Sequence, residues 1–296
     1  MIQIEAESLS KLAAKALEEC KKGVVHNLVL SGDFSYNESE SHFVMTYDGV
    51  ASKWQDHRKP NELLINHGQY IHRHGDGLAF LVRELKKKKD SNRACISLID
   101  MEDIINSHDD PIPSFMILQF GFAGEESKTL LTTAYFRALE VTCFLPINLA
   151  EISQVIRNLK IHFPEIERFR LVLHAFRAYA KQNFHCLRKA SIDSAEPTMI
   201  AYAVSKKNLA QLKEWLDSKI TIEESIICTD GLHHLRQAID MQKTDYTQEI
   251  LTHLDKVLND MQRLRLTRQS TSHSKAIEEL ETNIKKELLR VKELLI

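Results

Sequence analysis

Apolar residues follow two different spacings in the first part of the chain. A helical repeat, with apolar side chains three and four residues apart, predicts amphipathic helices over residues 9–20, 76–89 and 149–159. Runs rich in β-branched and aromatic residues predict strands over residues 24–30, 94–99, 114–122 and 128–136. The short loop 123–127 between the last two strands suits a β-hairpin. Helices and strands are therefore mixed in this half of the chain.

The pattern becomes purely helical beyond residue 197. Two amphipathic seams are predicted there, separated by the polar stretch 268–274. The first seam consists of Ile250, Leu254, Val257, Met261 and Leu264, and the second of Ile277, Leu280, Ile284, Leu288, Val291 and Leu295. Such seams need a partner, so the two helices are expected either to form a hairpin within the chain or to pair between chains as a coiled coil.

Helix-breaking residues divide the chain into two parts. All six prolines and eight of the nine glycines lie at or before Pro197, and residues 191–197 have the composition of a linker. The 15 basic and 15 acidic residues that follow are typical of helices with mixed-charge outer faces. We therefore expect a first domain over residues 1–190 and a helical interaction or assembly domain over residues 198–296, which could bind a protein partner.

Composition excludes several classes of protein. With 296 residues, 43% of them hydrophobic, the chain can bury a core, and its net charge of −2 argues against a nucleic-acid-coating role. The N-terminus lacks the basic and apolar segments of a secretion signal, and no apolar run is long enough to span a membrane. Five scattered cysteines without a C-x-x-C pair fit a reducing compartment. A cytoplasmic location without membrane contact is expected.

Four short motifs follow one another between about residues 67 and 180. His67 and Gly68 precede the predicted helix 78–88, which is followed by Asp90, Ser91, Asn92 and Arg93. Next come Pro113, Ser114 and an aromatic strand with Gln119, and then Tyr135, Arg137 and Glu140. The last motif, residues 145–150, reads Leu-Pro-Ile-Asn-Leu-Ala. In this order and spacing the chain resembles the thymidylate synthase and deoxycytidylate hydroxymethylase superfamily.

The resemblance implies a fold and part of a binding site. The fold would be α+β, a mixed β-sheet with packed helices, followed here by an all-α or coiled-coil extension. Arg137 would anchor a nucleotide phosphate, because a planar guanidinium meets phosphate oxygens with two parallel hydrogen bonds. Arg93 would be a second anchor that reaches into a neighbouring subunit, which implies a homodimer or higher homo-oligomer. Otherwise both arginines are expected in surface ion pairs.

The same resemblance assigns roles at the base and the sugar. Asn148 would hydrogen-bond the pyrimidine edge, since an amide offers both a donor and an acceptor. The resemblance also implies uracil over cytosine, because family members that act on cytosine tend to carry an aspartate at this position. The alternative role of Asn148 is the N-cap of a helix beginning at Leu149. Gln119 matches the family's strand glutamine, and Tyr179 would contact the sugar hydroxyl. The nucleotide-binding residues are therefore expected to be Arg93, Arg137, Asn148, Gln119 and Tyr179.

Departures from the family pattern concern the chemistry. Ser114 stands where the family has its cysteine nucleophile, and a hydroxyl needs an adjacent base that Phe115 cannot supply. Cys143 could replace the thiol, although a buried packing role is the simpler interpretation. Glu140 replaces an aspartate that orients the folate. No residue could be matched to the family's catalytic glutamate, so the site is expected to be catalytically degenerate.

Three histidines allow a further interpretation. His67, His72 and His74, together with Asp76, could be drawn as a metal cluster, but a polar loop is the favoured interpretation and no metal is expected.

Three functional hypotheses follow. The first is a pyrimidine nucleotide-binding protein, dUMP being the model ligand, that senses the nucleotide and acts through its helical extension without any cofactor. The second is an active pyrimidine C5 methyl- or hydroxymethyltransferase that uses 5,10-methylenetetrahydrofolate and a non-standard nucleophile. The third is a dimeric scaffold that binds no nucleotide.

Overall fold

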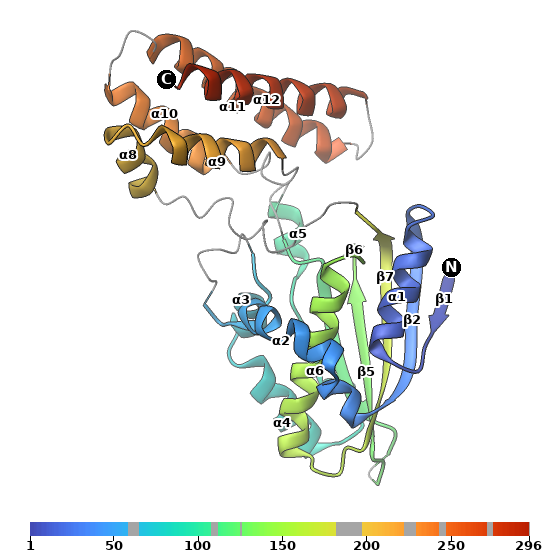
Figure 1. Ribbon diagram of the computed structural model, residues 1–296. Coiled ribbons are helices and arrows are strands. Elements are labelled where there is room, and N and C mark those ends of the chain that lie inside the picture. Colours follow the sequence, from blue (N-terminus) through green and yellow to red (C-terminus); the bar gives the residue numbers. More distant parts are fainter. Residues whose placement is uncertain are drawn as a thin grey trace. The chain divides into compact units, whose positions relative to one another are not determined.

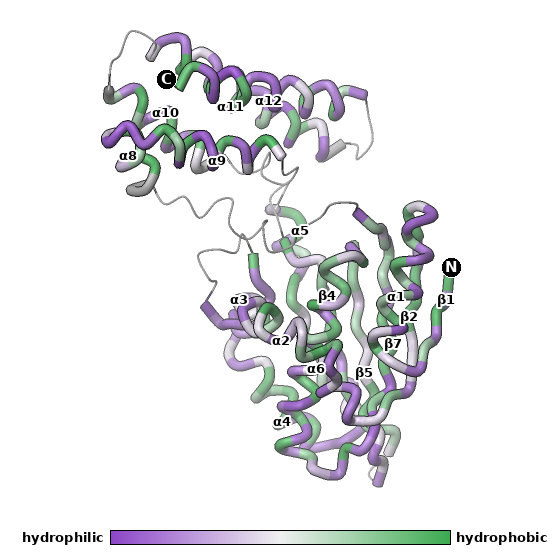
Figure 2. The backbone as a smooth tube through the Cα atoms, viewed as in Figure 1, coloured by the Kyte–Doolittle hydropathy of each residue, from purple (hydrophilic) through white to green (hydrophobic). Residues whose placement is uncertain are grey.

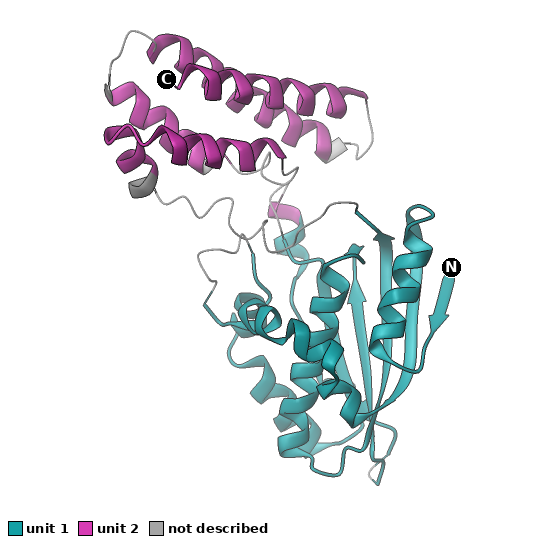
Figure 3. Cartoon of the chain, viewed as in Figure 1, with its two compact units in different colours: residues 1–60, 65–104, 112–186 teal, residues 61–64, 105–111, 187–296 magenta. Residues whose placement is uncertain are grey.

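The computed structural model describes residues 1–58, 65–107, 112–124, 126–181, 197–221, 229–242, 247–270 and 275–295. The chain divides into two compact units, shown in teal and magenta in Figure 3. Unit 1 comprises residues 1–60, 65–104 and 112–186, and unit 2 comprises residues 61–64, 105–111 and 187–296. The predicted linker, up to residue 196, lies outside the described residues. Each unit has its own hydrophobic core.

Unit 1 is built on a mixed, open β-sheet with the order β1-β2-β7-β5-β4-β3. Its antiparallel pairs are β2 with β7, β5 with β4 and β4 with β3, whereas β1 pairs with β2, and β5 and β6 pair with β7, in parallel. The strands are β1 (Ile2–Glu5), β2 (Val25–Ser35), β3 (Cys95–Ser97), β4 (Phe115–Phe122), β5 (Thr129–Phe136), β6 (Leu139–Glu140) and β7 (Arg168–Tyr179). The expected α+β fold with a mixed sheet is confirmed.

Helices pack over one face of this sheet, with α6 at the centre (Figure 1). They are α1 (Leu9–Cys20), α2 (His42–Gln55), α3 (Gly68–His72), α4 (Gly77–Lys87) and α6 (Phe144–His162), with a 3₁₀ helix at Tyr36–Glu40. Helix α5 (Met101–Ser107) has no buried residue, and residues 105–107 of it are assigned to unit 2. Alternate strand residues such as Leu30, Ala134 and Leu173 face the helices and are fully buried. Their neighbours on the opposite face, such as Ile117 and Phe176, are exposed.

Helix α6 begins five residues earlier than the sequence predicts. Pro146 is the third residue of the helix, where the missing N–H has no intrahelical acceptor to lose. The first turn is capped by the buried carboxylate of Glu140, which accepts hydrogen bonds from the backbone amides of Thr142, Cys143 and Phe144. Asn148 therefore lies inside the helix, and the prediction that it is an N-cap is wrong.

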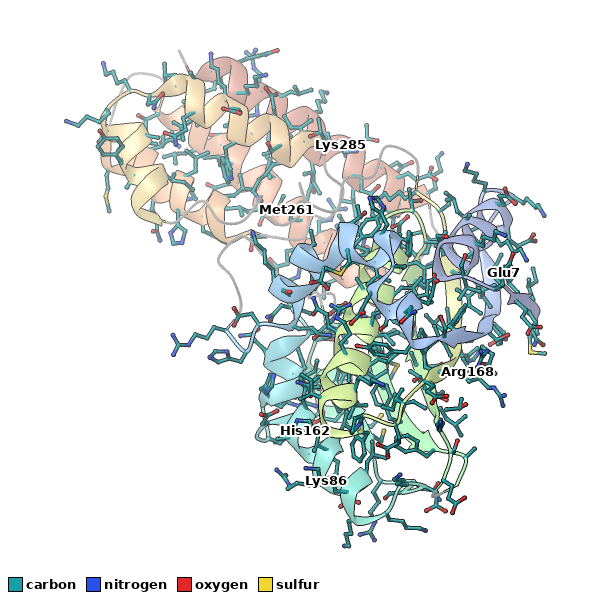
Figure 4. All side chains as sticks on the ribbon, turned by 60° about the horizontal axis from the view of Figure 1, so that its bottom comes forward. Glu7, Lys86, His162, Arg168, Met261 and Lys285 are labelled. Atoms are coloured by element: carbon teal, nitrogen blue, oxygen red, sulfur yellow. The ribbon has the colours of Figure 1, made fainter. Side chains whose placement is uncertain are left out.

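Unit 2 consists of helices around a separate core. They are α8 (Pro197–Ser205), α9 (Leu209–Thr221), α10 (Asp230–Gln242), α11 (Thr247–Ser270) and α12 (Lys275–Leu294). Along α11 and α12 hydrophilic and hydrophobic colours alternate from turn to turn in Figure 2. Both predicted seams are buried in one cluster, in which Met261, labelled in Figure 4, is fully buried. The two helices thus bury their seams as a hairpin within one chain, and no pairing between chains is needed for it.

Among the residues that the structure describes, no helix combines the length and the apolar character that crossing a bilayer requires.

Candidate functional site

A buried polar network lies in unit 1 where α6 meets the segment before α3. The Glu151 carboxylate accepts a hydrogen bond from Asn148 Nδ2 at its Oε2, at 2.9 Å, and its Oε1 lies 2.8 Å from His67 Nδ1. Glu151 is 0% exposed, Asn148 5% and His67 6%. A carboxylate in such surroundings is stable only with hydrogen-bond donors on its oxygens, and these two side chains supply them.

The backbone explains why the three side chains meet. Asn148 and Glu151 are three residues apart on α6, so they share one face of the helix. His67 is fixed by its own backbone amide, which donates to the carbonyl of Trp54 at the end of α2, at 2.8 Å. Gln55 of the same helix donates through Nε2 to the carbonyl of Glu151 at 2.9 Å. Helix α2 therefore ties both sides of the network together.

Aromatic rings surround the His67 imidazole. Its centroid lies 5.2 Å from Trp54 and 5.5 Å from Phe115, the latter in an edge-on arrangement. Phe115 in turn stacks on Phe136 at 4.4 Å, and Trp54 packs edge-on against Phe144 at 5.6 Å. These contacts hold the imidazole plane from two sides. Ring nitrogen Nε2 has no hydrogen-bond partner among the described residues.

Arg137 lies at the end of β5, directly after Phe136. Its Nε donates to the carbonyl of Pro113 at 3.2 Å and its Nη2 to that of Ile112 at 3.0 Å. Desolvation lowers the pKa of this guanidinium, and the nearby Tyr179 raises it in part. No carboxylate pairs with Arg137 within the part of the chain that the structure describes. Backbone carbonyls thus fix the guanidinium without neutralising its charge.

The expected surface ion pairs are made by other arginines of unit 1. Arg73, Arg157, Arg168 and Arg170 each pair with an aspartate, and Arg168 is labelled in Figure 4. Arg177, whose guanidinium lies 5.5 Å from the Tyr179 ring centroid, has no acidic partner among the described residues. Arg93, Arg137 and Arg177 are thus among the cationic side chains that have no paired acid in the described part of unit 1.

Arg93 and Arg137 are not brought together within one chain. Arg93 lies just before β3, and the carbonyl of the next residue, Ala94, accepts a hydrogen bond from the backbone amide of Phe120 at 2.9 Å. The backbone amide of Arg137 instead donates to the carbonyl of Ser114 at 3.0 Å. Six residues of β4 separate these two contacts, which corresponds to about 20 Å. Gln119 lies on the Arg93 side, with its Nε2 donating to the carbonyl of Asn92 at 3.1 Å. Tyr179 lies on the Arg137 side.

The candidate nucleophiles, Ser114 and Cys143, lie close to the end of the sheet that carries Arg137. Ser114 is half-buried, and its hydroxyl has no hydrogen-bond partner among the described residues. Cys143 is half-buried and forms the N-cap of α6. Burial raises the pKa of the Cys20 thiol to about 11 and also raises that of Cys95, so neither thiol is ionised at neutral pH.

The Glu140 carboxylate is bonded to the backbone. Oε1 accepts from the amides of Thr142 and Lys181, and Oε2 accepts from those of Cys143 and Phe144. The side chain is 3% exposed. Both oxygens are therefore occupied by the backbone, and the carboxylate serves to hold the start of α6.

The three histidines do not gather. His67 faces Glu151, whereas His72 ends α3 and its Nδ1 lies 3.7 Å from Asp76. Within the described ranges no three histidine, cysteine, aspartate or glutamate side chains are grouped to hold a metal ion.

Sequence reasoning missed Glu151 and Trp54. A signal for Glu151 existed, because it is the only charged residue between Glu140 and Arg157 in an otherwise apolar segment. A lone charge on an apolar helix must be buried with a partner or lie at a break in the packing.

Comparison with known proteins gave no match, either to a protein-family model or to a curated protein.

Proposed function

We propose that unit 1 binds a pyrimidine nucleoside monophosphate and that its site is catalytically degenerate. The observation that carries this proposal is the state of Arg137, whose guanidinium is oriented by two backbone carbonyls and has no carboxylate partner among the described residues. Two of its five N–H groups are used, and three remain for an anion. A phosphate is the natural ligand of a cation that is held in place but not neutralised.

The proposed base site is the network next to Phe115. Asn148 is fixed by Glu151 through one amide hydrogen and keeps its second hydrogen and its oxygen for the pyrimidine edge. Trp54, Phe115 and His67 offer ring faces and edges to a planar base. These features support the roles that the resemblance to thymidylate synthases implies for Asn148 and Arg137.

The proposed loss of catalytic activity follows from Ser114, which stands at the position of the family's nucleophile. Attack on pyrimidine C6 needs an ionised or base-activated nucleophile, and no base is hydrogen-bonded to this hydroxyl among the described residues. Glu140, the residue matched to the folate, is engaged by four backbone amides. We therefore propose binding without C5 chemistry, and without a folate cofactor.

The proposed assembly is a homodimer. Arg93 is exposed and lies about 20 Å along β4 from Arg137, so it could complete a phosphate site only in another subunit. The sheet face opposite the helices offers apolar side chains for such an interface, among them Val29, Ile117, Leu131, Tyr135, Val172 and Phe176. The same face on two copies would form an isologous contact.

Unit 2 is proposed to carry the response to the nucleotide. A polar groove of about 710 Å³ runs between α10 and α11, and its lining includes His233, Arg236, Gln237 and Gln262. Arg236 is paired with Asp255, which favours a protein partner over a nucleic acid. Nucleotide binding can change this interaction only if the two states of unit 2 differ in nucleotide affinity.

Thermal unfolding in the presence of dUMP, dCMP, dTMP, UMP and CMP tests the proposal. A nucleotide at about 100 times its Kd should add about 2.7 kcal/mol of stability. We expect a nucleotide-specific rise in Tm for the wild type and none for Arg137→Ala. Arg170→Ala is the matched control, because this arginine lies on the same sheet but is ion-paired with Asp33, and it should keep the shift. No shift at millimolar concentration with any nucleotide would contradict the proposal and favour the scaffold hypothesis.

A further inference from the structure

The imidazole of His67 in unit 1 is bonded on one side only. His67 is 6% exposed, and its Nδ1 lies against Glu151, which also binds Asn148 Nδ2. No described residue bonds to Nε2. A nearly buried ring nitrogen that is oriented on three sides and unpartnered on the fourth indicates a contact that the folded chain alone does not supply.

We infer that His67 is a ligand-binding residue whose Nε2 accepts a hydrogen bond from a ring N–H or an amino group of a planar heterocycle, and that Glu151 sets this polarity. The inference deepens the proposed nucleotide site and rests on it. It gives His67 a polar contact with the base beside its ring contact, and it gives Glu151 the role of setting that polarity.

The polarity follows from the chemistry of the carboxylate. An ionised carboxylate only accepts hydrogen bonds, so both neighbours of Glu151 must donate. Asn148 donates through Nδ2 at 2.9 Å, and His67 must carry its proton on Nδ1 to donate at 2.8 Å. A neutral imidazole with its proton on Nδ1 has a bare lone pair on Nε2. Glu151 therefore makes the outward nitrogen of His67 an acceptor.

The residues around His67 keep Nε2 a hydrogen-bond acceptor. Trp54 from α2 and Phe115 from β4 contact the imidazole, and neither carries a charge. The charged group bonded to the ring is Glu151, whereas the carboxylate of Asp56 accepts from the backbone amide of Arg58 at 2.9 Å. A 180° rotation of the ring would place Cδ2 against Glu151 and lose this hydrogen bond, so the contact with the carboxylate favours the orientation with Nε2 outward.

The ligand class is a heterocycle with a hydrogen on nitrogen at its polar edge. Uracil offers its ring N3–H and cytosine its exocyclic amino group. N-methylation removes these donors and leaves the phosphate untouched. Binding of methylated and parent nucleotides therefore separates the base contact at His67 from the phosphate contact at Arg137.

The experiment measures the Kd of UMP, N3-methyl-UMP, CMP and N4,N4-dimethyl-CMP at pH 8.5, about two units above the ordinary pKa of histidine. The wild type should bind the methylated form of its preferred nucleotide at least about tenfold more weakly, the cost of one lost buried hydrogen bond. His67→Phe, which keeps a ring but loses the acceptor, should bind the two forms within about twofold. His72→Phe, at a half-buried histidine whose Nδ1 also faces a carboxylate, that of Asp76 at 3.7 Å, should behave like the wild type.

Two results would overturn the inference while the proposed function stands. The first is equal binding of parent and methylated nucleotides by the wild type, and the second is an undiminished methylation penalty in His67→Phe. Failure of the wild type to bind any nucleotide overturns both. Should His67→Phe not fold, ¹⁵N spectra of the wild-type histidines decide the question. They should show Nε2 of His67 unprotonated and shifted by the parent nucleotide but not by its methylated form, and the absence of that difference would refute the inference.

Discussion

Two buried glutamates on either side of the α6 N-terminus show how a single side chain shapes this molecule. The Glu140 carboxylate accepts hydrogen bonds from backbone amides, and these bonds fix the start of the helix. The Glu151 carboxylate is hydrogen-bonded to side chains and thereby orients Asn148 and His67. Both residues are negatively charged and almost inaccessible, yet the first has a structural role and the second lies in the proposed binding site.

Removal of Glu151 should be costly for folding. In Glu151→Ala the donors of Asn148 and His67 lose their acceptors in a buried place, and we expect the free energy of unfolding to fall by about 2–4 kcal/mol. Glu151→Gln keeps the shape and one acceptor, so its loss should be smaller. Urea denaturation followed by the fluorescence of Trp54, in a Trp215→Phe background, measures both. Equal stability of wild type and Glu151→Ala would show that the network is not formed.

At the scale of elements, the sequence predicted what depends on local pattern. Helix α1 spans the predicted residues 9–20, and β3, β4 and β5 fall within the predicted strands. The start of α6 was wrong because its cap comes from Glu140, four residues before the helix, and no local rule assigns a cap to that side chain. The strand β7 was missed although its inward and outward residues alternate, and it takes a central place in the sheet.

The candidate site was predictable only in part. Arg137, Tyr179 and Asn148 could be named from motif order, and the structure places Arg137 beside Tyr179. The meeting of His67 with Glu151 joins residues 84 positions apart, and it depends on how α2, α3 and α6 pack rather than on any spacing in the chain. Long-range packing of this kind leaves no periodic signal in one sequence.

The N-terminus of α4 offers a test at this scale. Asp76 accepts hydrogen bonds from the amides of Leu78 and Ala79 at 3.0 and 3.1 Å. Asp76→Ala should lower the free energy of unfolding by about 1 kcal/mol, whereas Asp76→Asn, which preserves the cap, should cost only a few tenths. The same denaturation assay reports both values. A loss of similar size in the two variants would contradict the capping role.

At the scale of the whole molecule, two separate cores predict that the helical unit can be weakened on its own. Leu254 is fully buried in the core of unit 2, and Leu254→Ala should lower the stability of that unit by about 2–5 kcal/mol. Leu266→Ala, on the exposed side of the same helix, should have little effect. Trp215 fluorescence in a Trp54→Phe background follows the unfolding of unit 2. Nucleotide-induced stabilisation of unit 1, measured by calorimetry with Trp54 in place, should be unchanged in both variants, and its loss in Leu254→Ala would contradict the placement of the site within unit 1.

Arg137 is the residue that we propose to hold the nucleotide phosphate. The most direct measurement is the ³¹P resonance of a nucleoside monophosphate titrated with the full-length protein, because it reports on the phosphate itself. We expect the resonance to shift and broaden with the wild type and with Arg170→Ala, and to stay at its free position with Arg137→Ala. An unchanged resonance with the wild type, or an equal change with Arg137→Ala, would contradict the claim.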